Sequence, residues 1–325
     1  MHMTRRSALA LLAASAAAPA RAQQASGWPN RMITLVVPFP PGPAVDFVAR
    51  QVARKLSETL GQSIVVENRT GANGSIGATA VARAQPDGYT LLIGTAGTHG
   101  TAPHLTPNLP YDPVKDFSPI IAAVEPVTCL AVNASVPAKT VEELIAYAKQ
   151  RPGQLSYGSS GVGSVFHLFG EMFNRTAGLK IVHVPYRGVE PAMSDVIAGH
   201  IPMTFISVSN ALPSHEEGKA RILAVLEPAR FSRQPQIPSM SEILPEFRKP
   251  STWFGFLGPA GLDAGVVARL NAEIARALSA DDVRPRLEEL GFSVIGGSPD
   301  FFGALIRDGL ETYGALIREA NAASR

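Results

Sequence analysis

The sequence predicts an α/β fold in which parallel sheets are covered by helices on both faces. Short apolar runs rich in β-branched residues alternate with stretches of three- and four-residue apolar spacing, and brief Gly- and Pro-containing segments separate them. The chain of 325 residues is also longer than a single hydrophobic core usually fills. These observations together predict two α/β domains.

The first 22 residues are predicted to be a secretory signal peptide. Arg5 and Arg6 precede an apolar run from Ala8 to Ala18, and Ala20-Arg21-Ala22 is a small-x-small cleavage pattern. The run of about 11 apolar residues is too short to span roughly 30 Å of hydrocarbon. The arginine pair fits both Sec export and the twin-arginine route, which stay open. The mature chain is therefore expected outside the cytoplasmic membrane.

Individual elements follow from local patterns. The predicted strands are residues 33–37, 63–66, 89–93, 155–157, 181–184, 203–206 and 222–225. Thr140 and Glu143 form a capping box that opens a helix ending before Pro152. Gly61 is the expected stop of the first long helix. The other expected helices are residues 45–60, 75–84, 267–278 and 302–317.

Charge and cysteine content exclude several classes of partner. The signal segment carries three of the 29 Lys and Arg residues, so 26 remain against 27 Asp and Glu, a formal charge of −1. The chain has no basic stripe, which excludes nucleic acid and anionic membrane surfaces as expected partners. The single cysteine, Cys129, excludes an intramolecular disulfide and a Cys-based metal cluster. Cys129 lies in an apolar run and is expected to be a small buried hydrophobe.

Three loops that follow predicted strands carry the candidate site. In open α/β sheets, ligands bind outside the carboxyl ends of the strands. The loops are the Pro-rich segment 38–46, the hydroxyl-rich segment 94–100 and the Ser/Gly segment 158–164. The first and third lead into helices whose N-termini favour an anion. Either the loops converge on one small, oxygen-rich ligand, or they are tight turns and helix caps.

Several segments, in colinear order from about Trp28, resemble the substrate-binding receptors of tripartite tricarboxylate transporters, also called Bug receptors. They include VPFPPG from residue 37, VVENRTGANGSIGA from 65, PDGYTLLIGT from 86, LPYDPVKDFSPI from 109, YGSSGVGSVFHL from 157, VHVPYRG from 182 and WFGFLGPAGL from 253. The resemblance implies a two-lobed, type II-like periplasmic-binding-protein fold, with a mixed, mainly parallel sheet flanked by helices in each lobe. Crossover strands would join lobe 1 (28–126 plus 250–325) to lobe 2 (127–249).

The resemblance also implies a function: a periplasmic receptor, without catalysis or cofactor, that binds a small organic acid between its lobes. Its partners would be the permease subunits of a tripartite tricarboxylate transporter, and it would work as a monomer. Scattered histidines without paired spacing give no metal site. The ligand-binding residues expected from the loops and the resemblance are Phe39, Pro41, Gly42, Pro43, Ala44, Asp46, Thr95, Thr98, His99, Ser159, Ser160, Gly163, Ser164, His167, Arg187 and Ser207.

Alternatives stay open for several of these residues. Asp46 can contact the ligand or pair with Arg50 one helical turn later. Arg187 can clamp a carboxylate through its guanidinium or be a solvated loop residue. His167 can reach the cleft or pack beneath it. Added bulk at Gly163 is expected to weaken ligand binding without unfolding the protein.

Two departures from the family pattern bear on the ligand. Pro43 replaces a family glycine and removes a backbone N–H from the first loop. Ile206 and Ser207 stand where the family commonly has an acidic residue, and an acid there would suit a ligand amine. Its loss argues against an amino-acid ligand. With Val45 and Ile206 expected near the cleft, the sequence favours a carboxylate with an apolar or aromatic body.

Two other classes of function are weighed against the transport receptor. An exported hydrolase finds little support, because Gly158-Ser159-Ser160-Gly161 lacks the GxSxG spacing of a nucleophile elbow. The dinucleotide fingerprint and the P-loop are missing from the sequence as well. A receptor that docks on a signalling sensor would have the same cleft, and the sequence does not separate it from a transport receptor.

Overall fold

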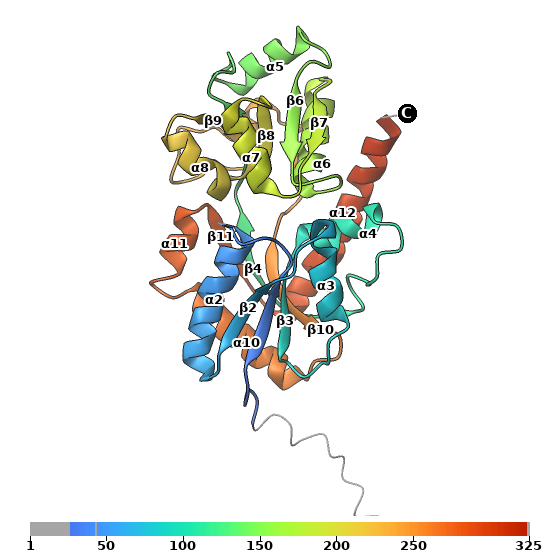
Figure 1. The fold of residues 1–325 in the computed structure, drawn as a ribbon, viewed down its shortest axis with the longest axis vertical. Coiled ribbons are helices and arrows are strands. Elements are labelled where there is room, and N and C mark those ends of the chain that lie inside the picture. Colours follow the sequence, from blue (N-terminus) through green and yellow to red (C-terminus); the bar gives the residue numbers. More distant parts are fainter. Residues whose placement is uncertain (1–26, 43, 324–325) are drawn as a thin grey trace, which may run out of the picture.

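The computed structural model describes residues 27–42 and 44–323, with side chains to residue 319. The predicted signal peptide and Pro43 lie outside the described residues. The described chain folds into two lobes, stacked along the long axis of the molecule (Figure 1). We use the predicted boundaries as a working definition of lobe 1 and lobe 2. None of the described helices combines the length and apolar character needed to cross a membrane.

The sheet of lobe 1 has six strands in the order β11-β4-β10-β3-β1-β2. Strand β1 pairs in parallel with β2 and β3. Strand β10 is antiparallel to β3 and β4, and β11 is antiparallel to β4. The strands are β1 Ile33–Val37, β2 Ile64–Asn68, β3 Thr90–Thr95, β4 Phe117–Pro126, β10 Phe254–Pro259 and β11 Phe292–Gly296.

The sheet of lobe 2 has five strands in the order β7-β6-β8-β5-β9. Strand β6 is parallel to β7 and β8, whereas β5 is antiparallel to β8 and β9. The mixed sheets and flanking helices agree with the prediction, but antiparallel pairings are more frequent than predicted. They arise where the crossover strands β4, β5 and β10 enter the sheets. The lobe 2 strands are β5 Thr128–Asn133, β6 Ser156–Ser159, β7 Val182–Pro185, β8 Met203–Ser207 and β9 Ala220–Val225.

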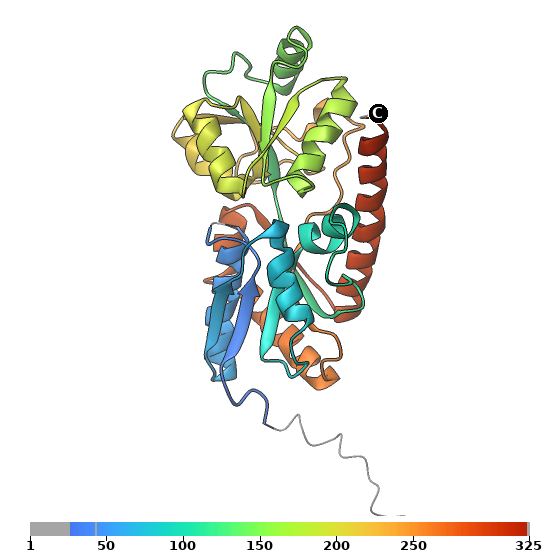
Figure 2. The ribbon, with the colours of Figure 1, turned by 45° about the vertical axis from the view of Figure 1, so that its right-hand side comes forward.

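Helices flank both sheets (Figures 1 and 2). Helix α2 buries its apolar stripe, including Val48, Val52 and Leu56, and ends at Gly61 with a φ of 67°. The hydroxyl of Thr140 accepts from the Glu143 N–H and caps α5. The predicted capping box forms only in part, because the Glu143 carboxylate accepts from the N–H of Lys139 and not from that of Thr140. The helices are α2 Val45–Leu60, α3 Ser75–Ala82, α4 Ala102–Leu105, α5 Val141–Lys149, α6 Val165–Ala177, α7 Val189–Ala198, α8 Val208–Glu216, α9 Met240–Ile243, α10 Ala264–Leu278, α11 Arg284–Glu289 and α12 Pro299–Ala323, with short turns at Ala72–Gly74 and Gly97–Thr101.

A buried ionic network lies where the chain crosses between the lobes. Strand β4 continues through Val127 into β5, and the chain returns to lobe 1 just before β10. The Lys249 side chain, only 3% exposed, pairs with Glu125 at 3.1 Å and with Glu227 at 3.2 Å. Glu227 also accepts hydrogen bonds from the backbone and hydroxyl of Thr128. The network therefore joins segments of both lobes at the crossover.

Helix α12 extends from lobe 1 along the side of lobe 2 (Figure 2). Its residue Leu316 packs against apolar clusters of both lobes, as does Val165 at the start of α6. Arg175 on α6 forms an ion pair with Glu319 on α12 at 2.5 Å. These contacts connect the two lobes beside the region between them.

Candidate functional site

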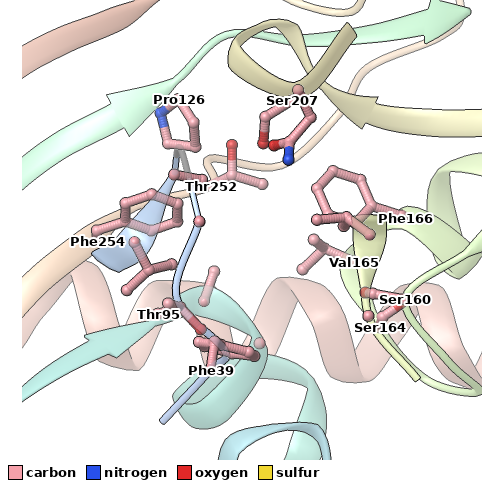
Figure 3. Close-up of a pocket in the computed structure, with 18 of the residues that line it drawn as sticks. Phe39, Thr95, Pro126, Ser160, Ser164, Val165, Phe166, Ser207, Thr252 and Phe254 are labelled. Atoms are coloured by element: carbon pink, nitrogen blue, oxygen red, sulfur yellow. The ribbon is translucent and has the colours of Figure 1, made fainter. Parts of the chain in front are cut away.

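A cavity of about 120 Å³ lies between the two lobes. Lobe 1 contributes the β1–α2 loop and the end of β3, and lobe 2 contributes the starts of α6, α7 and α8. The crossover segments form its remaining wall, through Pro126, Thr128 and Thr252–Phe254. Figure 3 shows Ser160, Ser164, Val165 and Phe166 facing Phe39 and Thr95 across this space. Elements from both lobes thus meet around one cavity, as ligand-binding clefts of two-lobed proteins require.

Asp46 holds the β1–α2 loop in place through hydrogen bonds. The Asp46 carboxylate accepts hydrogen bonds from Arg50 at 2.8 Å and from the Asn68 amide at 2.9 Å. The same Asn68 amide donates to the carbonyl of Phe39. Burial opposes ionisation of Asp46, but the hydrogen bonds from Arg50 and Asn68 lower its pKa below the ordinary value. Asp46 lines the cavity and is already fully engaged in positioning the loop.

Three helices, α2, α7 and α8, begin at the cavity without a side-chain cap. Their N-cap residues are Ala44, Gly188 and Ser207, and none of these side chains accepts a hydrogen bond from the first turn of its helix. All three residues line the cavity. Uncapped N-termini present backbone N–H groups and a positive dipole end, which together favour an anion. By contrast α6 is capped, because Ser164 accepts from the N–H of His167.

The hydrogen-bond donors of the cavity are hydroxyl and amide groups and not positively charged side chains. The hydroxyls of Ser160 and Ser207 and the amide nitrogen of Asn210 make no hydrogen bond to any described residue. Among the described lining residues there is no lysine and no arginine, and the acids are Asp46 and Glu190. An anion bound here would therefore be held by hydroxyl, amide and helix N-terminal groups.

The walls between these donors are apolar and aromatic. Phe39 and Val45 contribute from lobe 1, Phe166 from lobe 2, and Trp253 and Phe254 from the returning crossover segment. Figure 3 shows Phe39, Phe166 and Phe254 on different sides of the space. Such a surface fits the hydrophobic body of a ligand whose polar end is bound by the donors.

The structure brings half of the predicted residues to the cavity. Those that line it are Phe39, Gly42, Ala44, Asp46, Thr95, Ser160, Ser164 and Ser207. Those outside the lining are Pro41, Thr98, His99, Ser159, Gly163, His167 and Arg187. The position of Pro43 lies outside the described residues.

Thr98 and His99 are part of the core. Thr98 is fully buried, and its hydroxyl donates to the carbonyl of Thr95 and accepts from the N–H of the same residue. The His99 ring is fully buried, 4.7 Å from the Phe117 ring, with Nδ1 2.8 Å from the Thr98 hydroxyl. The chain turns inward at residues 97–101, and this turn directs both side chains away from the cavity.

Ser159 and His167 stabilise the Ser/Gly loop by accepting hydrogen bonds from its backbone N–H groups. The Ser159 hydroxyl lies 2.7 Å from His183 Nε2 and accepts from the N–H of Gly161. His167 Nδ1 accepts from the N–H of Gly163, and its ring stacks on His183 with centroids 4.0 Å apart. His167 therefore packs beneath the loop, which is one of the two alternatives left open by the sequence.

Arg187 and Ile206 do not face the cavity. Arg187 is exposed, and its neighbour Gly188, with a φ of 133°, redirects the chain so that the next residues, Val189 and Glu190, line the cavity instead. Ile206 is fully buried in an apolar cluster of lobe 2, on the opposite face of β8 from Ser207. Ile206 therefore does not influence the ligand directly.

The histidines predict a pH dependence of stability. Burial lowers the pKa of His99 to about 3, and burial together with the neighbouring His167 lowers that of His183 to about 4. Between about pH 6.5 and pH 4, the unfolded chain therefore binds more protons than the folded protein. The free energy of unfolding should fall as the pH drops through this window. Urea unfolding at several pH values should show this slope, and His183→Gln should flatten it; an unchanged slope in the variant would contradict this contribution.

Gly163 contacts the other lobe rather than the cavity. Its φ is 79°, and an added Cβ would lie 2.6 Å from Cδ1 of Leu105 in lobe 1. Gly163→Ala should therefore weaken ligand binding by about tenfold, because the methyl group would push the lobes apart. Gly153→Ala is the matched control, since Gly153 has a φ of 73° with open space around it. Calorimetric titration of both variants tests this, and equal affinities would contradict it.

Sequence reasoning missed lining residues on several elements. The crossover residues Pro126, Thr128 and Thr252 carry no motif, and only the fold brings them together. Asn73 lies in a left-handed conformation and donates to the carbonyl of Val162 across the lobes at 2.8 Å. Glu190 could have been found as an acid in the first turn of a helix that follows a strand.

The fold and the cavity between its lobes define a solute-binding protein. Residues 48–322 match the family described as the Tripartite tricarboxylate transporter family receptor. The chain is 33% identical to Protein BugT of Bordetella pertussis over 99% of both chains. We conclude that the chain belongs to the tripartite tricarboxylate transporter receptor family, which confirms the resemblance seen in the sequence.

Solved structures of relatives share the fold. A Rhodopseudomonas palustris protein, Rpa4515 with adipate, is 36% identical with a TM-score of 0.87, covering 90% of this chain and 98% of its own. MatC (Rpa3494) from the same organism, with bound malate, is 34% identical with a TM-score of 0.83, covering 89% of this chain and 100% of its own. The two-lobed α/β fold class is thereby confirmed.

Proposed function

We propose that the protein is a periplasmic receptor that binds a small organic carboxylate between its lobes and delivers it to a tripartite tricarboxylate-type permease. The observation that carries this proposal is the convergence of the uncapped N-termini of α2, α7 and α8 on one cavity. Such donors bind an anion, including a carboxylate, without a lysine or arginine. The adipate and malate bound by the two relatives support a carboxylate ligand.

The aromatic walls support a carboxylate with an apolar or aromatic body. Phe39, Phe166 and Phe254 offer apolar contact area on different sides of the cavity. The ligand would bridge donors of both lobes and shift the balance of open and closed arrangements toward the closed one. The closed surface would then be recognised by the permease, and the ligand would be released unchanged.

A thermal-shift screen of the mature chain, residues 23–325, tests the proposal. A ligand that binds only the folded protein raises its melting temperature by mass action. Organic acids with apolar bodies should raise it, whereas their neutral primary amides should not. Chromatography of the recovered ligand should show no turnover. A stronger effect from the amides than from the acids would contradict a carboxylate receptor.

A further inference from the structure

Glu190 places a carboxylate directly between the lobes. It lies in the first turn of α7, is partly buried and lines the cavity. A Cβ added to Gly42 of lobe 1 would lie 2.6 Å from Glu190 Oε1, and one added to Gly188 would lie 3.4 Å from Oε2. The carboxylate thus spans the gap between the β1–α2 loop and the start of its own helix.

This carboxylate has no protein partner among the described residues. None of their side-chain hydrogen bonds or ion pairs includes Glu190, whereas Asp46, the other acid of the cavity, is held by Arg50 and Asn68. In the empty cavity, water can solvate Glu190. A ligand that fills the cavity removes this water, and an unpaired buried carboxylate is costly.

The position of Glu190 restricts what the ligand can bring next to it. A second carboxylate of the ligand would lie there beside the negative charge of Glu190, in a cavity from which binding has removed the water. A hydroxyl or an ammonium group would instead donate a hydrogen bond to Glu190 and satisfy it. Glu190 already lies over the start of α7 and beside Gly42 in the loop that leads into α2. The N-terminus of α8, with Ser207 and Asn210, is therefore left for the carboxylate of the ligand.

We propose that Glu190 determines ligand specificity, an inference that rests on the proposed carboxylate-binding function. Glu190 selects a monocarboxylate whose other end carries a hydrogen-bond donor. This revises the expectation drawn from Ile206 and Ser207. The acid that is missing at the end of β8 is supplied by α7, so a ligand amine or hydroxyl has an acceptor in the cavity.

A matched ligand series tests the proposal by calorimetry. Hexanoate, 6-hydroxyhexanoate, 6-aminohexanoate and adipate share one chain and differ only at the far end; butanoate, 4-hydroxybutanoate, 4-aminobutanoate and succinate form the shorter series. They are titrated into the wild type, Glu190→Gln and Glu142→Gln. Glu142 is the matched control, because it is an exposed acid at the same first-turn position of α5, on the far side of lobe 2.

The wild type should bind a hydroxy or amino member at least about tenfold more tightly than the dicarboxylate of the same length. Glu190→Gln should remove this preference by strengthening the dicarboxylate about tenfold, while Glu142→Gln keeps it. If Glu190→Gln weakens binding of the amino member alone, the donor is an ammonium group. If it weakens binding of the amino and hydroxy members similarly, a hydroxyl group is a sufficient donor. Thermal unfolding of each variant confirms that it is folded.

A wild type that prefers the dicarboxylate, or a preference unchanged in Glu190→Gln, would overturn the role of Glu190 and leave the receptor function standing. If no carboxylate of either series, and none in the thermal-shift screen, bound the wild type, the receptor function itself would fail. The two failures are therefore distinguishable by whether any carboxylate binds at all.

Discussion

Lys249→Met should destabilise the protein by about 3–5 kcal/mol, the loss typical when one partner of a buried ion pair is removed. The variant keeps the volume of the side chain but leaves Glu125 and Glu227 facing each other without a cation. Glu227 is mostly buried, and burial raises its pKa, so its charge depends on Lys249 for compensation. Urea unfolding at neutral pH measures the loss.

Two further variants separate the buried pair from a general charge effect. Lys139→Met removes an exposed lysine and should change stability little. Adding Glu227→Gln to Lys249→Met should recover much of the loss, because it removes the uncompensated charge. Equal losses for Lys249→Met and Lys139→Met would show that the crossover network contributes nothing.

Ser207→Asp should weaken carboxylate binding on the order of 100-fold, because two carboxylates about 5 Å apart repel by roughly 3 kcal/mol at an effective dielectric constant of 20. Ser207 is the N-cap residue of α8, has an extended backbone conformation and does not cap its helix. Aspartate there would accept from the first-turn N–H groups, so the empty protein should keep its stability. Calorimetric titration of the ligand and thermal unfolding measure the two effects.

Ser207→Asn is the matched control for this charge. Asparagine has nearly the same shape and caps a helix about as well, but it adds no negative charge. It should retain most of the affinity. Equal loss of binding in both variants would mean that the size of the side chain, and not anion binding at α8, explains the effect.

Local patterns predicted much of the fold. Strand β1 and helix α2 matched their predicted bounds because apolar spacing and the Gly61 stop are local signals. Strand β4 was missed because Pro119 and Pro126 argue against a strand, and Pro119 is accommodated at an irregularity in the pairing with β10. Strands β10 and β11 were missed in the C-terminal part, where local patterns predicted only the helices at residues 267–278 and 302–317.

The candidate site was predicted at the level of loops rather than side chains. The rule that ligands bind beyond the carboxyl ends of strands selected three loops that each contribute residues to the cavity between the lobes. Which side chains face inward depends on backbone geometry that the sequence does not show. Gly188 turns the chain so that Glu190 rather than Arg187 reaches the cavity, and the turn at residues 97–101 buries His99.

Fluorescence of Trp253 tests the central claim most directly. The chain has two tryptophans; Trp253 lines the cavity, whereas Trp28 packs in the core of lobe 1. In a Trp28→Phe protein, Trp253 is therefore the only tryptophan reporter. Titration with a carboxylate that raises the melting temperature should change its emission saturably, with the Kd found by calorimetry. Calorimetric binding with unchanged Trp253 emission would mean that the ligand binds outside the cleft between the lobes.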